Sequence, residues 1–195
     1  MVIMKKKVLY LHGFLSSNDS DTLKSLIESY GYKYEFITIE LNFADPRHTL
    51  QIINECITKE KLSLIIGNSL GGFYALICNN NHIPIIVINP CLDPYVQLKR
   101  HLSDGSITMD VIEAYKEYKH DKVKDIIKSK LGEFYALLSS KDEILGDSHI
   151  KFFMEVKEET KYKYMIANII DGFMHRVYPK GMSWLRDCID DIMYG

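Results

Sequence analysis

The stretch Leu62–Gly72, LSLIIGNSLGG, contains the residues that decide the fold. Its first half is mainly apolar, which is typical of a strand buried on both faces of a sheet. Its second half carries GNSLG at positions 67–71, a Gly-x-Ser-x-Gly motif, and the apolar segment 70–78 is expected to be a helix. The alternative is a glycine-rich turn that has no catalytic role. A strand before the motif and a helix after it favour instead a turn that presents the Ser69 hydroxyl at the carboxyl edge of a sheet.

Elsewhere, short apolar runs alternate with amphipathic segments. Because the runs are apolar at nearly every position, they predict an α/β fold with a mostly parallel central sheet. Apolar residues at helical spacing in the other segments predict helices on both faces of that sheet. The expected strands are 8–11, 34–41, 62–68, 83–89, 134–139 and 162–170, and the expected helices are 22–30, 46–59, 70–78, 148–158 and 181–193.

The segment 91–130 interrupts this alternation. Apolar residues such as Ile112, Tyr115 and Val123 form a rough stripe along it, and charged residues fill the other positions. Two interpretations stay open: a solvated helix that packs on the sheet, or a small helical lid over a site. In either case the length of 195 residues predicts one domain over residues 1–195.

Charge and cysteine content argue against several function classes. The 24 basic and 26 acidic side chains give a net charge of −2, whereas a general nucleic-acid binder usually has a basic excess. The four cysteines include no Cys-x-x-Cys pair, so we expect neither a zinc site nor a redox dithiol. We interpret them as reduced thiols, which are typical of a cytosolic protein.

Apolar runs in this chain are short. The apolar run that follows the lysines at positions 5–7 ends after four residues, Val8–Leu11. The apolar segment of a signal peptide is about 7–15 residues long. No run approaches the roughly 18 apolar residues that cross a bilayer. We therefore expect a cytoplasmic protein with no membrane partner and no nucleic-acid partner.

A serine hydroxyl attacks a carbonyl carbon readily only when a base accepts its proton and a carboxylate orients that base. With this kind of strand–turn–helix motif, the order along the chain is serine, acid, histidine. His175 follows the last expected strand and the loop residue Gly172, so we interpret it as the base. His149 is a weaker candidate, because it lies in or just before an expected helix.

The acid is expected in the loop that follows the strand 134–139. Asp142 is the preferred candidate in that loop. Glu143 and Asp147 stay open as alternatives, since a carboxylate in a loop is often only solvated.

An acyl-transfer site also needs N–H groups that bind the developing oxyanion. We expect one from Leu70, the residue after the nucleophile, and one from Phe14, in the loop after the first strand. Gly13 lets the backbone of that loop approach closely. His12 lies at the end of the first strand, where a role in bracing the loop is favoured over a role as the base.

With these residues placed, the chain resembles the α/β-hydrolase superfamily and, more narrowly, the small bacterial esterases of the YqiA/YcfP type. The segments that carry the resemblance are YLHGF at 10–14, GNSLGGFYA at 67–75, INP at 88–90, DEIL at 142–145, and the pair Gly172 and His175. The resemblance implies an α/β-hydrolase fold with little or no cap, and a serine hydrolase without a metal or other cofactor. It places the nucleophile, acid and base on Ser69, Asp142 and His175.

The combined pattern predicts a serine esterase that cleaves carboxylic esters of modest size through an acyl-serine intermediate. One alternative is an acyl-CoA thioesterase, in which Lys99, Arg100 and His101 would meet phosphates. The other is a binding or regulatory module that keeps a hydrolase fold without its chemistry. For the enzyme, the expected partner is a small-molecule ester or thioester.

Overall fold

The computed structural model describes residues 5–80, 82–129, 133–160 and 165–194, and within them the chain forms one parallel sheet. The spatial order of its strands is β2-β1-β3-β4-β5-β6, and every neighbouring pair is parallel. The strands are β1 (Lys6–Leu11), β2 (Tyr34–Thr38), β3 (Leu62–Asn68), β4 (Ile85–Ile88), β5 (Phe134–Ser139) and β6 (Met165–Ile170). The predicted α/β fold with a parallel sheet is therefore confirmed.

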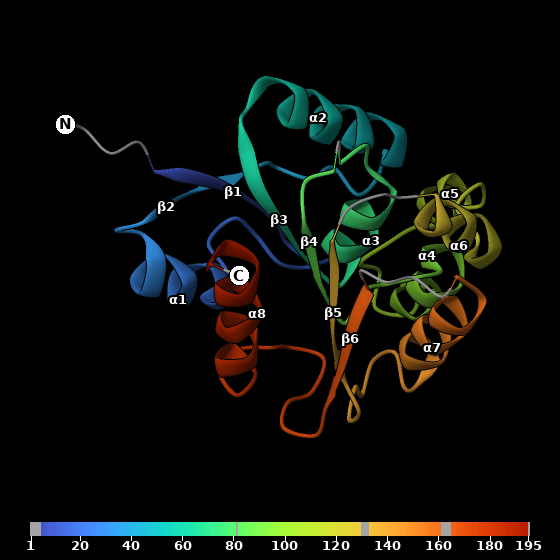
Figure 1. Ribbon diagram of the computed structural model, residues 1–195. Coiled ribbons are helices and arrows are strands. Elements are labelled where there is room, and N and C mark those ends of the chain that lie inside the picture. The colour runs from blue at the N-terminus through green and yellow to red at the C-terminus, as the bar shows by residue number, and fades with distance from the viewer. Residues whose placement is uncertain (1–4, 81, 130–132, 161–164, 195) are drawn as a thin grey trace.

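Five helices cover the two faces of this sheet in the described part of the chain: α1 (Asp21–Tyr30), α2 (Pro46–Lys59), α3 (Leu70–Ile77), α7 (Ser148–Thr160) and α8 (Met182–Tyr194). Helices α1 and α8 lie on one face, and α2, α3 and α7 on the other (Figure 1). Alternate side chains of each central strand divide between these two layers. In β4, for example, Ile85 and Val87 pack towards α3, whereas Ile86 and Ile88 pack in the core with α1 and α8.

The helix boundaries follow from local chemistry. The Asp45 side chain accepts the N–H of His48 and caps α2, where Pro46 is the first helical residue. The Ser20 hydroxyl caps α1 in the same way by accepting the N–H of Leu23. Both helices and the strands β3 and β5 are confirmed within one residue of their expected bounds. The expected strand 162–170 begins outside the described residues, and its described part is β6.

The segment 91–130 is not one helix, so the first of its two interpretations is wrong in that respect. It contains α4 (Pro94–Gln97), a 3₁₀-helix (Leu98–Leu102), α5 (Met109–Ala114) and α6 (His120–Lys128). Ile112, Tyr115 and Val123 are buried in the same core as α3. The ring of His101 lies 5.0 Å from the ring of Phe14, so this segment reaches the loop after β1. Its role as a lid stays a prediction.

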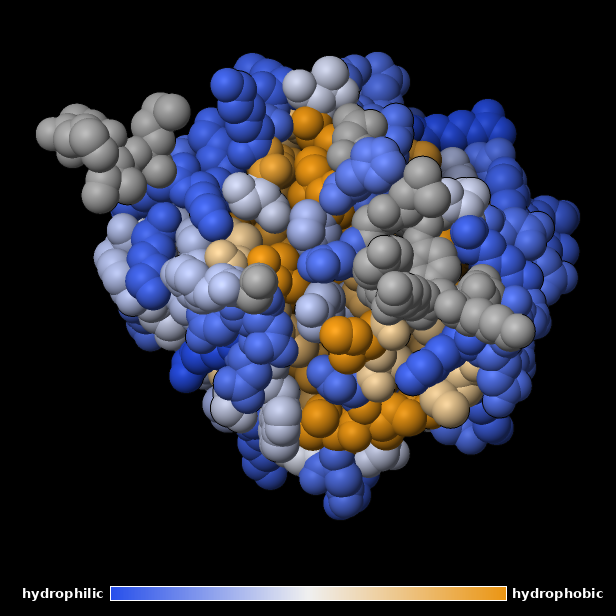
Figure 2. All heavy atoms as spheres, in the orientation of Figure 1, coloured by the Kyte–Doolittle hydropathy of each residue, from blue (hydrophilic) through white to orange (hydrophobic). Residues whose placement is uncertain are grey.

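Hydrophilic and hydrophobic residues occupy different parts of the surface. Figure 2 shows that hydrophilic residues cover the outer helices, whereas hydrophobic residues gather in the middle of this face, between α8 and α7. Among the described helices, none combines the length and the apolar character that crossing a bilayer requires. The four cysteines all lie within the described residues, and none of them is in a disulfide.

Candidate active site

Ser69 lies in a strained turn between β3 and α3. Its φ of 52° and ψ of −117° belong to a region that side-chain-bearing residues rarely adopt. Neighbouring backbone groups hold this conformation. The Ser69 N–H donates to the carbonyl of Ile88 at 2.9 Å, and the Ser69 carbonyl accepts the N–H groups of Phe73 and Cys91. The end of β4 therefore fixes the nucleophile candidate from the side.

Two glycines make this turn possible because the backbone is crowded around them. A Cβ atom at Gly67 would lie 2.5 Å from the carbonyl oxygen of Gly71. A Cβ atom at Gly71 would overlap the carbonyl oxygens of Leu11 and His12, at the end of β1. Helix α3 therefore starts as close to β1 as the backbone allows, with its free N–H groups behind Ser69.

The side chains of Ser69, His175 and Asp142 form a continuous hydrogen-bonded chain. His175 Nε2 lies 2.9 Å from Ser69 Oγ, and His175 Nδ1 lies 2.7 Å from Asp142 Oδ2. The three residues follow the carboxyl ends of β3, β6 and β5. Because all these strands are parallel, their carboxyl ends meet at one edge of the sheet, and residues far apart in the sequence come together there.

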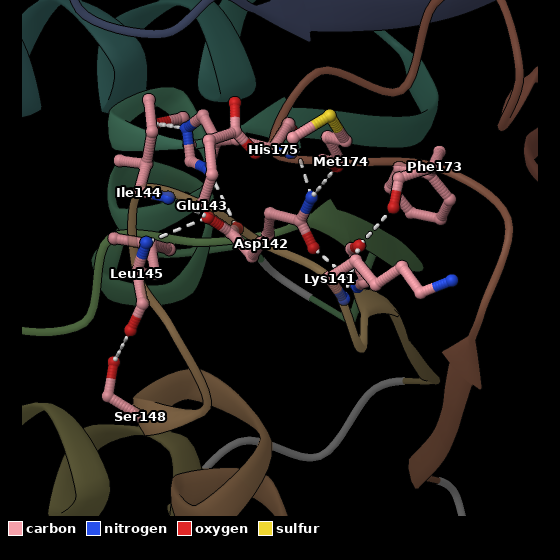
Figure 3. Close-up of polar contacts among 12 residues, drawn as sticks. Lys141, Asp142, Glu143, Ile144, Leu145, Ser148, Phe173, Met174 and His175 are labelled. Carbon is pink, nitrogen blue, oxygen red and sulfur yellow. Dashed lines mark hydrogen bonds and ion pairs between the residues drawn. The ribbon is translucent and has the colours of Figure 1, made fainter.

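Asp142 is a buried carboxylate, and Figure 3 shows it beside Ile144 and Leu145 of the same loop. Its Oδ1 accepts the N–H groups of Ile144 at 2.8 Å and Leu145 at 2.7 Å, so the loop after β5 turns around it. Burial by itself raises the pKa of Asp142. The hydrogen bond and the charge of His175, together with the two N–H groups, outweigh burial and lower this pKa below its ordinary value. Asp142 is therefore ionised at neutral pH.

The alternative acids and the alternative base lie outside this chain of hydrogen bonds. Glu143 accepts the backbone N–H of His175 at 2.8 Å and makes no hydrogen bond to the ring. Asp147 forms an ion pair with Lys151 at 2.7 Å. His149 is buried on α7, where burial lowers the pKa of its imidazole, and it has no hydrogen bond to Ser69 or Asp142. None of these three contacts the Ser69 hydroxyl.

The loop after β1 lies directly against Ser69. A Cβ atom at Gly13 would be 3.0 Å from the Cβ of Ser69. His12 is buried behind this loop, with Nδ1 2.9 Å from the Gly13 carbonyl oxygen and its ring edge-on to Phe43. Burial lowers the pKa of the His12 imidazole, which favours the neutral ring as the donor that braces this carbonyl.

The two expected oxyanion donors flank the nucleophile. Leu70 is the first residue of α3, and Phe14 follows the glycine that lies against Ser69. Within the described residues, neither N–H has an acceptor in the protein. The Gly13 carbonyl and the Phe14 N–H belong to one peptide unit and point in opposite directions. The hydrogen bond between His12 and this carbonyl therefore also fixes the direction of the Phe14 N–H.

Asn89 has a structural role that the sequence analysis does not assign. It is fully buried at the end of β4, with a φ of 40°. Its Nδ2 donates to the carbonyls of Met174 at 3.0 Å and His175 at 2.9 Å, and its Oδ1 accepts the N–H of Ser139 at 2.7 Å. The signal that could have found it is an asparagine directly after a buried strand, at the edge where the other site residues lie.

A cleft of about 690 Å³ opens above Ser69 and His175. The loop after β1 forms one wall, and residues 176–179 form another. Its lining includes Ser16, Ser17 and Thr22, together with charged residues and Phe14. Among the described residues, no cluster of three or more histidine, cysteine or acidic side chains could hold a metal ion.

Comparison with protein families finds a match over residues 7–177, to the uncharacterised protein family UPF0227. The chain belongs to this family. The comparison with curated proteins found no match.

Solved structures resemble this family member over nearly its whole length. A putative hydrolase from Agrobacterium vitis S4 has a TM-score of 0.75 at 12% identity, over 97% of this chain and 88% of that chain. The α/β-hydrolase enzyme MGS-MChE2, from a sediment metagenome of the Mar Chica lagoon in Morocco, has a TM-score of 0.72 at 13% identity, over 96% and 91%. A monoacylglycerol lipase from Paleococcus ferrophilus has a TM-score of 0.68 at 16% identity, over 95% and 93%. The protein therefore has the α/β-hydrolase fold, as its sequence predicts.

Gly71→Ala is expected to destabilise the fold by about 3 kcal/mol, because the new methyl group overlaps two backbone carbonyls. Gly105→Ala is the matched control. Position 105 has open space around it and a φ of 73°, so only backbone strain of about 1 kcal/mol is expected there. Chemical denaturation measures both free energies of unfolding, and equal losses for the two variants would contradict the close packing of α3 on β1.

The lowered pKa of Asp142 predicts a pH-dependent contribution to stability. A carboxyl group that binds its proton more weakly in the folded state favours that state when it is ionised. This contribution is complete above the ordinary pKa of 3.8 and is lost as the pH falls through the lower folded value. We expect Asp142→Asn to be less stable than wild type at neutral pH, and the difference to shrink below about pH 4. Urea unfolding at a series of pH values measures this, and a constant difference would contradict it.

Proposed function

We propose that this protein is a serine esterase that hydrolyses carboxylic esters of modest size. The observation that carries the proposal is the continuous chain of hydrogen bonds from the Ser69 hydroxyl through His175 to the buried Asp142. A base that contacts the hydroxyl, and a carboxylate that contacts the base, are the two partners that serine needs as a nucleophile. The hydrolase and lipase among the structural neighbours agree with this chemistry.

The reaction begins with the proton of His175 on Nδ1, where it is donated to Asp142. Ser69 Oγ attacks the ester carbonyl while His175 Nε2 accepts the hydroxyl proton. The imidazolium that forms is stabilised by the ionised Asp142, and it then protonates the departing alcohol oxygen. Water attacks the acyl-Ser69 ester in the second half of the reaction, with His175 again as the base.

The backbone N–H groups of Phe14 and Leu70 are assigned to the oxyanion. They flank Ser69 and are unoccupied by protein acceptors within the described residues. Preorganised donors of this kind stabilise negative charge as it develops on the carbonyl oxygen, and removal of one donor typically costs about a hundredfold or more in rate. The start of α3 adds the positive end of a helix dipole on the same side.

The cleft favours a small and partly polar substrate. Serine, threonine and charged residues in its wall suit an ester of modest size better than a long aliphatic chain, which would lie against polar groups. The three basic residues considered for an acyl-CoA substrate do not line it. Lys99 lies over the ring of Tyr95 at 4.3 Å, His101 packs on Phe14, and Arg100 donates to the carbonyl of Ile144. A simple ester is therefore preferred over acyl-CoA.

Ser69→Ala is expected to lower the turnover of p-nitrophenyl acetate by roughly a thousandfold or more while the free energy of unfolding stays near that of wild type. Ser129→Ala, at an exposed position after α6, is the control and keeps full activity. Mass spectrometry after treatment with a fluorophosphonate should place one adduct on residue 69. Folded wild-type protein that neither turns over the ester nor takes up the label would favour the binding-module alternative.

A series of p-nitrophenyl esters and acyl-CoA thioesters of matched acyl length tests the substrate class. We expect kcat/KM to be highest for short acyl chains and to fall as the chain outgrows the cleft, because added methylenes are left in water. Acyl-CoA substrates should be turned over more slowly than the esters of the same acyl group. A preference for acyl-CoA would support the thioesterase alternative instead.

A further inference from the structure

Two consecutive carboxylates in the loop after β5 contact His175 at different points (Figure 3). Asp142 accepts from the imidazole ring, and Glu143 accepts from the backbone N–H of the same residue, with Oε2 2.8 Å from the nitrogen. The proposed function uses the first contact and leaves the second without a role. Glu143 is exposed to solvent, so water surrounds its carboxylate on the side that faces away from this hydrogen bond.

The second contact completes the support of the His175 backbone. The carbonyl of His175 is already held by Asn89, at the end of β4, through a bond of 2.9 Å. The N–H has no acceptor other than Glu143 among the described residues. One polar group of the His175 backbone is thus tied to β4 and the other to the loop that carries Asp142. A ring whose backbone is held at both ends has few positions from which Nε2 can reach Ser69.

The geometry separates this role from two simpler ones. A catalytic acid would contact Nδ1 of the imidazole, and Glu143 contacts the backbone instead. A merely solvated carboxylate would contact no protein group, as is usual for a glutamate in an exposed loop. A hydrogen bond from an N–H to an ionised carboxylate is stronger than one between neutral groups, so it can hold a loop residue in place.

We propose that Glu143 is a positioning residue that holds the backbone of His175 while Asp142 orients its ring. The proposal rests on the function proposed above for Ser69 and His175. Both carboxylates then help to place the base. Asp142 acts through the imidazole ring of His175, and Glu143 acts through its backbone N–H. Small errors in the placement of a reacting group lower the rate of the chemical step far more than they lower substrate binding.

Three variants test this role. Glu143→Ala removes the acceptor, and we expect kcat for p-nitrophenyl acetate to fall roughly tenfold to a hundredfold with KM nearly unchanged. Glu143→Gln keeps an oxygen acceptor of the same reach and should restore most of the rate. Asp147→Asn, in the same loop and paired with Lys151, is the control and should behave as wild type.

Each contrary result overturns the proposal in a distinct way. An unchanged kcat in Glu143→Ala would show that the contact has no function, and a Gln variant as slow as the Ala variant would show that acceptance of the N–H is not what matters. A loss as large as that of Ser69→Ala, with Asp142→Asn still active, would make Glu143 the acid itself.

Amide hydrogen exchange gives a readout that does not depend on activity. The His175 N–H should exchange faster in Glu143→Ala than in wild type and remain protected in Glu143→Gln and Asp147→Asn. Unchanged exchange in Glu143→Ala would overturn the proposal even if Ser69→Ala confirms the esterase. Faster exchange, together with an active Ser69→Ala protein, would locate the failure in the proposed function and not in the contact between Glu143 and His175.

Discussion

The close approach of α3 to the end of β1 is the constraint on which the site depends. A side chain at position 71 would overlap the carbonyl oxygens of Leu11 and His12, so only glycine lets the helix begin this near the sheet. The approach places the start of α3 behind Ser69 and the loop after β1 in front of it. This packing brings the nucleophile candidate next to Phe14, in the loop after β1, and to Leu70, the first residue of α3.

Polar side chains hold the other half of the site. The loop that carries His175 has no regular structure of its own, yet side chains satisfy its backbone groups. Ser139 donates to the carbonyl of Phe173, Asn89 donates to the next two carbonyls, and Glu143 accepts the N–H of His175. The buried backbone groups of a loop need such partners, since an unpaired one costs as much as a lost hydrogen bond. The same bonds keep the imidazole in place.

Local patterns in the sequence were sufficient to predict most of the fold and to select the three candidate residues Ser69, Asp142 and His175. Strands β3 and β5 lie where continuous apolar runs predict them, and α2 begins at Pro46 because a capping aspartate precedes a proline. Segment 91–130 was harder, since its apolar stripe fits one helix as well as several short ones. There, burial of Ile112 and Val123 against the core of α3 decides the outcome, and the sequence pattern carries no such information.

The parallel α/β architecture, the turn at Ser69 and the candidates for nucleophile, acid and base can all be predicted from the amino-acid sequence. The architecture and the turn depend on the period of apolar residues and on glycines at fixed spacing. The acid and base candidates depend on their places directly after predicted strands. All of these are properties of neighbours along the chain. The sequence does not predict that Asp142 contacts the ring of His175 while Glu143 contacts its backbone, or that Asn89 joins β4 to the same loop. Those choices depend on how three strand ends meet in space, where a shift of one residue exchanges one carboxylate for the other.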